Sequence, residues 1–459
     1  MDATRRSRPA DSTLPGTATL RTAVAAALRD AGLEGSHVAV ALSGGRDSIA
    51  LVDAAASVRD DLRVALVALH VHHGLSPHAD RWVEVCRDRC AALGVPLAIR
   101  RVEVSRRPRT SIEATARDAR YAALAGLALA RGARAVLLAH HADDQAETVL
   151  LQLVRGSGPQ GLAAMPANAV DRGVRWLRPF IGVPREAIDA YVAVRGLGYV
   201  DDESNADPRY RRNALRARVV PALRALAPGY PLTVVRAARL QADAGALLDD
   251  LAAIDARSAY DGASLARERL RALGPRRAAN LLRWFLREHG LPAPSSVRLA
   301  EMLRQLANAG DDAQVKLVHA GRALGIHRGR IFVHRPQPLS WAQPWSGAET
   351  VELPHGTLRL LRVEAAGIAA GRLGAGRVII RPGSPGERLG LAGRPRRPVA
   401  DLLREAGVPP WERTGLPRVC CDDALVAVAG IGVDARFAAT GSESGYRLEW
   451  QPLLDGSPC

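Results

Sequence analysis

Short apolar runs alternate with longer helix-like segments through the N-terminal part of the chain. The apolar runs begin near Val38, Val64, Leu97, Ala135 and Val174, and the helix-like segments lie between them at 48–58, 79–93, 111–131 and 144–155. Repeating units of roughly 30 residues in this order are typical of parallel strands whose crossover helices cover both faces of a sheet. The pattern predicts an α/β fold with a doubly wound parallel sheet, in which ligands bind beyond the carboxyl ends of the strands.

The pattern changes beyond Arg209, where Leu, Ala and Arg alternate over long stretches. The segments 237–254 and 264–289 predict helices, 315–333 predicts a small hairpin, and three prolines between Pro336 and Trp345 indicate a linker. β-like runs at 351–363, 378–381 and 424–429 and one helix at 399–406 follow. We expect a disordered leader at 1–19, an α/β domain at 20–222, a mainly helical domain at 223–335, a linker at 336–346 and a small α+β domain at 347–459.

The first predicted strand ends in a glycine turn, Ser43 to Ser48, that leads into a helix. Adjacent glycines let the backbone approach a ligand, and a helix N-terminus favours an anion such as phosphate. Asp47 would repel phosphate unless a cation lies between them, and Mg²⁺ is the simplest choice. The turn lacks the Gly-Lys-Ser/Thr ending of a Walker loop, which argues against a kinase or GTPase. Six residues alone leave open a chance serine-glycine turn.

Polar groups also follow the second and fourth predicted strands, at His70 to Gly74 and at His140 to Thr148. Asp144 and Glu147 are three residues apart, so their carboxylates share one helix face near its positive N-terminal end. A charged N-terminal cap is the plain alternative. A transition-metal centre is a second alternative, with the ligands His70, His72, His140 and His141.

Charge points to a polyanionic partner, because 63 basic residues outnumber 47 acidic ones and the net charge is +16. Lys316 is the only lysine, and an arginine bias also follows from GC-rich coding, so the position of arginine clusters is more informative than their number. Five arginines fall within 209–218, and helical spacing spreads them over more than one face, which suits a curved phosphate backbone. A solvated basic helix is the alternative.

The five cysteines form no Cys-x-x-Cys pair and are expected to be reduced thiols in a cytosolic protein. Cys86 and Cys90 lie one helical turn apart and are better explained as core residues than as metal ligands. No apolar run reaches membrane-spanning length, and the leader lacks the apolar region of a signal peptide.

Together these segments resemble one family of PP-loop ATP pyrophosphatases, the tRNA(Ile)-lysidine synthetases in their long form. The motifs occur in order: S-G-G-x-D-S at 43–48, H-x-x-H-G-L at 70–75, E-A-x-A-R-x-x-R-Y at 113–121, H-H-x-x-D-x-x-E-T at 140–148, R-G-S-G at 155–158 and R-N-x-x-R at 212–216. The segments 381–388, 408–411 and 430–437 resemble the C-terminal domain of that family. Two departures are the basic segment 394–398, which has arginine where lysine is expected, and His72, where Asn or Asp is common.

The resemblance implies that ATP adenylates the C2 oxygen of the wobble cytidine of tRNA(Ile) with a CAU anticodon, and that free L-lysine then displaces AMP. A ring oxygen leaves poorly until it carries AMP, so pyrophosphate must be held by the glycine turn and Mg²⁺. We expect a cytoplasmic enzyme without membrane contact and leave open whether it is a monomer or a homodimer. The resemblance implies these roles: catalysis by Asp47, His140, Asp144 and Glu147; nucleotide binding by Ser43, Gly44, Gly45, Arg46, Asp47, Ser48, His70, Arg117, Arg155 and Gly156; Mg²⁺ binding by Asp47; and tRNA binding by Arg209, Arg211, Arg212, Asn213, Arg216, Arg394, Arg396 and Arg397, with the domains 223–335 and 347–459.

Two other functions stay open on the sequence. A tRNA-thiolating PP-loop enzyme would share the nucleotide-binding half but commonly uses paired catalytic cysteines, and Cys86 and Cys90 have the wrong spacing for that. A non-catalytic, arginine-rich RNA-binding protein would have no need for Asp47, Asp144 and Glu147 together.

Overall fold

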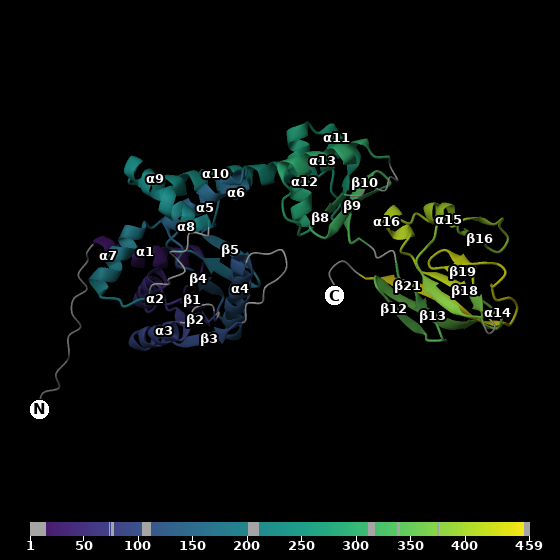
Figure 1. Ribbon diagram of the computed structural model, residues 1–459, viewed down its shortest axis with the longest axis horizontal. Coiled ribbons are helices and arrows are strands. Elements are labelled where there is room, and N and C mark those ends of the chain that lie inside the picture. Colours follow the sequence, from purple (N-terminus) through teal and green to yellow (C-terminus); the bar gives the residue numbers. More distant parts are fainter. Residues whose placement is uncertain are drawn as a thin grey trace, which may run out of the picture. The chain divides into compact units, whose positions relative to one another are not determined.

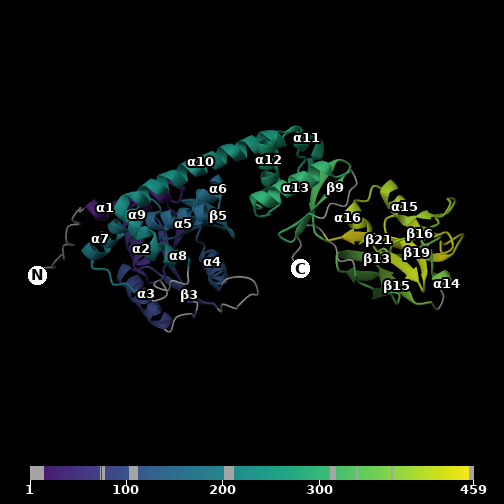
Figure 2. The same cartoon turned by 45° about the horizontal axis from the view of Figure 1, so that its top comes forward.

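The computed structural model describes residues 15–72, 74, 78–102, 112–200, 211–310, 317–336, 340–373 and 376–453. The chain divides into two compact units, Met1–Ala246 and Leu247–Cys459. The division falls within α10 (Tyr230–Ala256), which Figure 2 shows as one continuous helix. No helix in the described part of the chain is long and apolar enough to cross a membrane.

The first unit is built on a six-stranded sheet with the order β3-β2-β1-β4-β6-β5 (Figure 1). Five of its strands are parallel, and β5 pairs antiparallel with β6 at one edge. The parallel strands begin within a residue or two of the positions predicted from the apolar runs, so the fold class is confirmed. The edge strand was not predicted, because its exposed residues carry no apolar alternation. The strands are β1 (His37–Ala41), β2 (Ala65–His72), β3 (Leu97–Arg101), β4 (Ala135–Leu137), β5 (Asn168–Asp171) and β6 (Val174–Leu177).

Helices cover both faces of this sheet because successive residues of each strand point to opposite sides. Val38 and Val40 of β1 pack in one core with α1, α2, α3 and α7, whereas Ala39 packs in a second core with α4. α1 begins at Pro15, inside the expected leader, because Leu20 and the residues one and two turns later are buried. The helices of this unit are α1 (Pro15–Asp30), α2 (Arg46–Val58), α3 (Ala79–Leu93), α4 (Ile112–Ala130), α5 (Ala142–Val154), α6 (Pro159–Leu162), α7 (Arg185–Arg195), α8 (Arg211–Arg218) and α9 (Val220–Leu226).

The second unit begins with helices packed on a four-stranded sheet of order β7-β10-β9-β8. The single helix predicted at 264–289 is wrong. Residues 264–266 pair with β10, and Pro275 starts a new helix after Gly274, so the segment forms a strand and two helices. The hairpin predicted at 315–333 is confirmed over its described residues by β9 and β10. The elements are β7 (Ser264–Ala266), α11 (Arg267–Ala272), α12 (Pro275–Glu288), α13 (Ser296–Asn308), β8 (Leu317–His319), β9 (Arg322–His327) and β10 (Arg330–His334).

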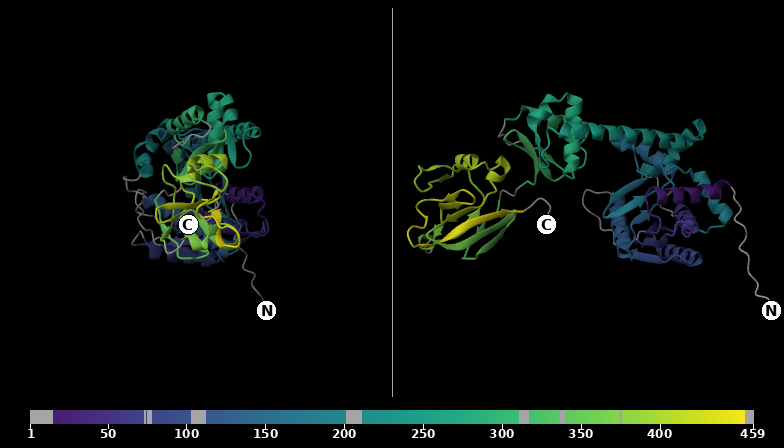
Figure 3. Two further views of the ribbon diagram at one scale, coloured as in Figure 1. Left: turned by 90° about the vertical axis from the view of Figure 1, so that its right-hand side faces the viewer. Right: turned by 180° about the vertical axis from the view of Figure 1, so that it is seen from behind.

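The remainder of the second unit contains a five-stranded sheet, a four-stranded sheet and a two-stranded ribbon around a shared apolar core. Part of the expected linker at 336–346 is structured, because β11 pairs with β15 and the Trp341 ring packs against His355. The longest pairing, β13 with β21, joins segments about ninety residues apart and was not predicted; Figure 3 shows yellow β21 beside green β13. The elements are β11 (Gln343–Pro344), β12 (Thr350–Leu353), β13 (Gly356–Glu364), β14 (Ile368–Ala369), α14 (Ala370–Leu373), β15 (Val378–Arg381), β16 (Arg388–Leu389), β17 (Arg397–Pro398), α15 (Val399–Glu405), α16 (Pro410–Arg413), β18 (Arg418–Cys421), β19 (Ala424–Val428), β20 (Gly432–Val433) and β21 (Ser444–Pro452).

Candidate active site

The glycine turn after β1 is held by its own two serines. Ser48 Oγ donates to Gly45 O at 2.8 Å, and the backbone N–H of Ser43 donates to Ser48 Oγ at 3.1 Å. Gly44 has φ +89°, which strains any residue with a side chain, and a Cβ at this position would lie 3.2 Å from Val200 Cγ2, so the valine would have to shift slightly. Gly45 caps α2 without a side-chain hydrogen bond, which leaves the first N–H groups of the helix available to an anion.

Asp47 lies in the first turn of α2, where its carboxylate faces both cations and other carboxylates. Its Oδ1 is buried and has no hydrogen-bond partner among the described residues, although Arg46 Nε lies 3.6 Å away. Burial raises the pKa of Asp47, and the nearby charge of Asp144 adds to this, while His141 and Arg46 act in the opposite direction. Arg46 turns toward α7, where it pairs with Asp189 at 2.7 Å.

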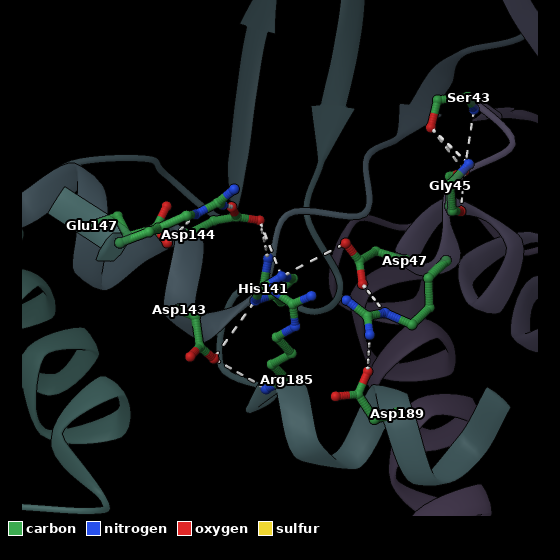
Figure 4. Close-up of polar contacts among 12 residues, drawn as sticks. Ser43, Gly45, Asp47, His141, Asp143, Asp144, Glu147, Arg185 and Asp189 are labelled. Carbon is green, nitrogen blue, oxygen red and sulfur yellow. Dashed lines mark hydrogen bonds and ion pairs between the residues drawn. The ribbon is translucent and has the colours of Figure 1, made fainter. Parts of the chain in front are cut away.

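His141 stands at the centre of three carboxylates, as Figure 4 shows. Its Nε2 lies 3.5 Å from Asp144 Oδ2 and 3.7 Å from Asp47 Oδ2, and its Nδ1 lies 3.7 Å from Asp143 Oδ2. The ring is 2% exposed, and its residue precedes the first turn of α5. The turn after β4 thereby joins the α5 carboxylates to the glycine turn after β1.

The two adjacent histidines have opposite electrostatic environments. Burial by itself would lower the pKa of His141, but contact with Asp143 and the charges of Asp144 and Asp47 outweigh it, so that pKa is raised. Burial lowers the pKa of His140 to about 3, and the cationic side chains of Arg178 and Arg117 contribute. At neutral pH His140 is therefore a neutral imidazole. From the sequence we expected a catalytic role for His140 and not for His141, because two neighbouring histidines give no sign of which one faces the carboxylates.

Two arginines of α8 bind the carboxylates of α5. Glu147 accepts hydrogen bonds from Arg212 Nε at 2.9 Å and from Arg216 Nε at 2.6 Å, and its side chain is 5% exposed. Arg216 also reaches Asp144 Oδ1 at 3.3 Å. Nη2 of Arg212 donates a hydrogen bond to Thr148 Oγ1 at 2.9 Å. Both arginines were expected to bind tRNA, and here they neutralise the carboxylates that were expected to act in catalysis.

Asp143 fixes the start of α5 from a third direction. Its Oδ2 accepts the backbone N–H of Arg185 at 3.1 Å, and its Oδ1 accepts from Arg224 at 2.7 Å. Burial by itself would raise the pKa of Asp143, but His141 and Arg224 outweigh it, so the carboxyl remains ionised. From the sequence we expected no role for Asp143 beyond that of a helix cap. Its partners Arg185 and Arg224 lie more than forty residues away in the chain, and no local pattern indicates them.

The other predicted nucleotide-binding residues lie at different distances from this cluster. His70 lies beneath the glycine turn, with Nδ1 at 2.8 Å from Leu42 O. Arg117 on α4 lies over the ring of Tyr121 and is close enough to His140 to lower its pKa. Arg155 and Gly156 follow the C-terminal end of α5, roughly 20 Å along the helix from His141 at about 1.5 Å per residue, so the structure does not bring them into the cluster.

The predicted tRNA-binding residues fall into two groups. Arg209 lies outside the described residues, Arg211 is exposed, and Asn213 is half-buried beside it on α8. In the second unit, Arg394 and Arg396 are exposed on a turn. Arg397 pairs with Glu405 at 2.6 Å, Arg394 lies 3.5 Å from the same carboxylate, and Arg396 lies 3.8 Å from Asp434. The two pairs with Glu405 are at the surface, where ionic contacts exchange readily for contacts with phosphate, whereas Asp434 is buried.

The cysteines of α3 belong to the core. Cys86 and Cys90 are buried, and burial raises their thiol pKa values to about 12 and about 11, so both are neutral thiols at neutral pH. Cys86 Sγ lies 3.5 Å from His70 Nδ1. In the described part of the chain, no group of three or more His, Cys, Asp or Glu side chains is arranged to hold a metal ion by itself.

Comparison with known proteins gives matches along most of the chain. The matching family models are a PP-loop domain over residues 17–223, a TilS substrate binding domain over 265–332 and a TilS substrate C-terminal domain over 378–450. A tRNA(Ile)-lysidine synthase from Nitrosomonas europaea is 38% identical over 428 residues, which cover 91% of this chain and 92% of that protein. One from Alkalilimnicola ehrlichii is 43% identical over 423 residues, with coverage of 90% and 93%. Among solved structures, the U34-tRNA thiolase NcsA from Methanococcus maripaludis is 16% identical, covers 50% of this chain and 78% of that chain, and has a TM-score of 0.43.

Proposed function

The chain belongs to the tRNA(Ile)-lysidine synthase family, and from that premise we propose how its residues divide the reaction. The enzyme is an ATP-dependent ligase that forms a carbon–nitrogen bond on tRNA(Ile). ATP adenylates the C2 oxygen of the wobble cytidine and releases pyrophosphate. The ε-amine of lysine then attacks C2, and AMP leaves with the oxygen, which gives lysidine. The observation that carries our assignment is the meeting of the glycine turn and the α5 carboxylates at His141.

In this proposal the turn at 43–48 holds the pyrophosphate end of ATP. The uncapped N-terminus of α2 offers backbone N–H groups, and the absence of side chains at Gly44 and Gly45 lets phosphate oxygens come close to the backbone. The two serine hydroxyls maintain the turn through hydrogen bonds, so the N–H groups keep their direction when the ligand arrives. Preorganised donors of this kind stabilise the charge that leaves with pyrophosphate.

Asp47 fits the role of a Mg²⁺ ligand. A buried carboxylate oxygen without a hydrogen-bond donor, on a group whose pKa is raised by burial, is stabilised by a cation that also binds phosphate. Mg²⁺ typically takes one or two protein carboxylates and completes its shell with phosphate oxygens and water. Bound there, the ion would supply positive charge to the pyrophosphate as it leaves. Arg46 lies between two carboxylates, with Nη1 at 2.7 Å from Asp189 Oδ1 and Nε at 3.6 Å from Asp47 Oδ1, so Asp189 holds this cation beside Asp47.

We assign lysine to the α5 carboxylates, Asp144 and Glu147. In this structure Arg212 and Arg216 occupy them, so the ammonium of lysine must replace one guanidinium before it can bind. The exchange conserves charge, because one cation takes the place of another beside the same carboxylate. One carboxylate then accepts the proton that lysine must lose to become a nucleophile.

The two histidines take different parts in this proposal. His140 is neutral, so it acts at the α-phosphate as a hydrogen-bond donor and not as a cation. His141 positions Asp47 and Asp144 relative to each other, and it thereby couples the ATP half of the site to the lysine half. The low pKa of His140 favours contact with phosphate over transfer of a proton.

We further propose that the exposed arginines of α8 and of the 394–397 turn bind the tRNA backbone, together with the domains 223–335 and 347–459. The net charge of +16 supports electrostatic attraction to RNA. A cytoplasmic location fits the four described cysteines, all of which are free thiols. We include the CAU anticodon in the proposal, because the anticodon of an isoleucine tRNA ends in AU and the wobble base to be modified is cytidine. Sedimentation velocity at several protein concentrations would distinguish a monomer from a homodimer.

Nucleoside analysis of the product tests the proposal. The protein is incubated with tRNA(Ile), ATP, Mg²⁺ and labelled lysine, and the digested tRNA is examined for lysidine. We expect labelled lysidine with one AMP and one pyrophosphate released for each lysine incorporated. A matched reaction without lysine should release pyrophosphate and leave adenylated tRNA. Sulfur incorporation from a thiol donor would instead indicate a thiolating enzyme, and tRNA binding without pyrophosphate release would indicate a non-catalytic protein.

A further inference from the structure

Trp411 of α16 lies on the β9–β10 hairpin, in a socket of aromatic rings. Its ring stacks on His334 with centroids 4.6 Å apart and an angle of 9° between the planes. Phe332 lies 5.5 Å away and His327 lies 6.4 Å away at a right angle. All four residues belong to the second unit. His327 and Phe332 lie in the region that one family model matches, 265–332, and His334 follows two residues beyond it, whereas Trp411 lies in the region that another model matches, 378–450.

Two glycines shape the contact from opposite sides. A Cβ at Gly325 of β9 would overlap the Trp411 ring, so the floor of the socket admits only glycine. Gly407, which has φ +73° and precedes α16, lies against the guanidinium of Arg328, and a Cβ there would overlap that group. The two surfaces therefore fit each other closely at Trp411 and again at Gly407, which is typical of a specific interface.

Neither apolar core depends on Trp411. The core of residues 256–331 contains Phe285, Met302 and Ile331, and the core of residues 351–429 contains Leu358, Val419 and others, but Trp411 packs in neither. Each region thus has its own apolar core, and Trp411 lies at the contact between the two regions. The covalent connection from β10 to β11 runs over residues 335–342, and eight extended residues reach at most about 28 Å. That tether alone would allow many relative orientations.

We propose that Trp411 is a docking residue that fixes the domain at 347–459 to the helical domain, so that their two RNA-binding surfaces engage one tRNA as a single rigid bivalent surface. This rests on the proposed function, in which both domains bind tRNA. Two linked sites bind a long ligand most tightly when their spacing is preset, because the second contact then forms without ordering the linker. Trp411 raises the tRNA affinity of the protein without touching RNA. Its loss should therefore not change the number of phosphate contacts.

The test compares tRNA binding by wild type, Trp411→Ala, Trp411→Phe and Gly325→Ala. Trp411→Ala empties the socket, whereas Gly325→Ala forces the ring out of it from the other side. Trp411→Phe retains an aromatic ring that can stack on His334. We expect tRNA affinity to fall at least tenfold in both alanine variants and by less than threefold in Trp411→Phe. A tenfold loss is smaller than the gain in affinity that two sites at a preset spacing can provide.

Three further readouts separate docking from damage to a domain. The slope of log affinity against log salt should be unchanged in Trp411→Ala, because the same phosphates are neutralised. A duplex RNA of about ten base pairs, too short to span both surfaces, should bind wild type and Trp411→Ala equally. Lysidine formation should show a raised KM for tRNA with an unchanged kcat. Trp345→Phe is the matched control: this ring belongs to the 336–346 segment and packs on Tyr446 of the domain at 347–459, so the variant should bind tRNA as wild type does.

The proposal is overturned if full-length tRNA binds Trp411→Ala as tightly as wild type, or if the short duplex loses as much affinity as the tRNA. The second result would mean that the change damages one RNA surface directly. These outcomes are independent of the catalytic assignment, because a wild-type protein that makes no lysidine could still bind tRNA and could still show the difference between tRNA and duplex.

Discussion

Glu147→Gln is the substitution that most directly tests the α5–α8 network. Glutamine has nearly the same shape, but it removes a buried negative charge that binds Arg212 at 2.9 Å and Arg216 at 2.6 Å. Removing one partner of a buried ion pair costs about 3–5 kcal/mol. The side chains of Arg212 and Arg216 are 28% and 31% exposed, so water solvates them in part after the carboxylate charge is removed. We therefore expect the free energy of unfolding to decrease by only about 2 kcal/mol.

This loss should be visible in thermal unfolding of the ligand-free protein. For a unit of the size of Met1–Ala246, each kcal/mol lowers the melting temperature by about 2–4 °C, so we expect a decrease of about 4–8 °C. A double-mutant cycle with Arg216→Gln should recover part of the loss, because the second change removes the cation that the first left unpaired. A change below about 1 °C, or strict additivity in the cycle, would refute the network as a source of stability.

The same variant separates the two half-reactions. Lysine has a side-chain pKa near 10.4, so forming the neutral amine at about pH 7.4 costs about 4 kcal/mol, and loss of a positioned base typically reduces the rate by about 10²–10⁴. ATP binding should change little, because Asp47 and the glycine turn are intact. Single-turnover chemistry with labelled ATP and labelled lysine should therefore show adenylated tRNA accumulating while lysine incorporation falls. Equal loss of both steps would place Glu147 in the ATP half of the site.

Three other changes test the remaining parts of the site. Asp47→Ala should abolish AMP and pyrophosphate release while the melting temperature stays within about 2 °C, and near-normal turnover would exclude Asp47 as the Mg²⁺ ligand. Changing Arg394, Arg396 and Arg397 together to Gln should weaken tRNA binding. The slope of log tRNA affinity against log salt concentration should decrease in magnitude by roughly 0.7–0.9 per lost phosphate contact, and ATP affinity, the control, should not change. An unchanged slope would mean that these arginines do not contact RNA. The pKa of His141 is raised in the folded state, so its contribution to stability is complete below the unfolded pKa of about 6.5 and is lost as pH rises through the folded pKa. His141→Gln should therefore reduce the melting temperature more at pH 6 than at pH 9. An equal reduction at both pH values would contradict this.

The sequence determined the elements whose signals are local. Parallel strands buried on both faces read as continuous apolar runs, and the glycine turn at 43–48 follows the first of them directly, so the α/β sheet and the position of the turn were both predictable. The α5 helix was also predictable, because Asp144 and Glu147 lie at its N-terminal end. The prediction of one helix at 264–289 was wrong. Ser264 and its neighbours have a composition typical of a helix, but they pair with a strand about sixty residues later in the chain.

Only the tertiary structure decided which groups meet and what charge they carry. His140 and His141 are equivalent in sequence, yet burial makes one neutral and three carboxylates favour the charged form of the other. The pairing of Arg212 with Glu147 joins residues sixty-five positions apart, and the stacking of Trp411 on His334 joins residues still farther apart. Such contacts depend on how separate elements pack, and neither periodicity nor motif spacing contains that information, because each describes only neighbours along the chain.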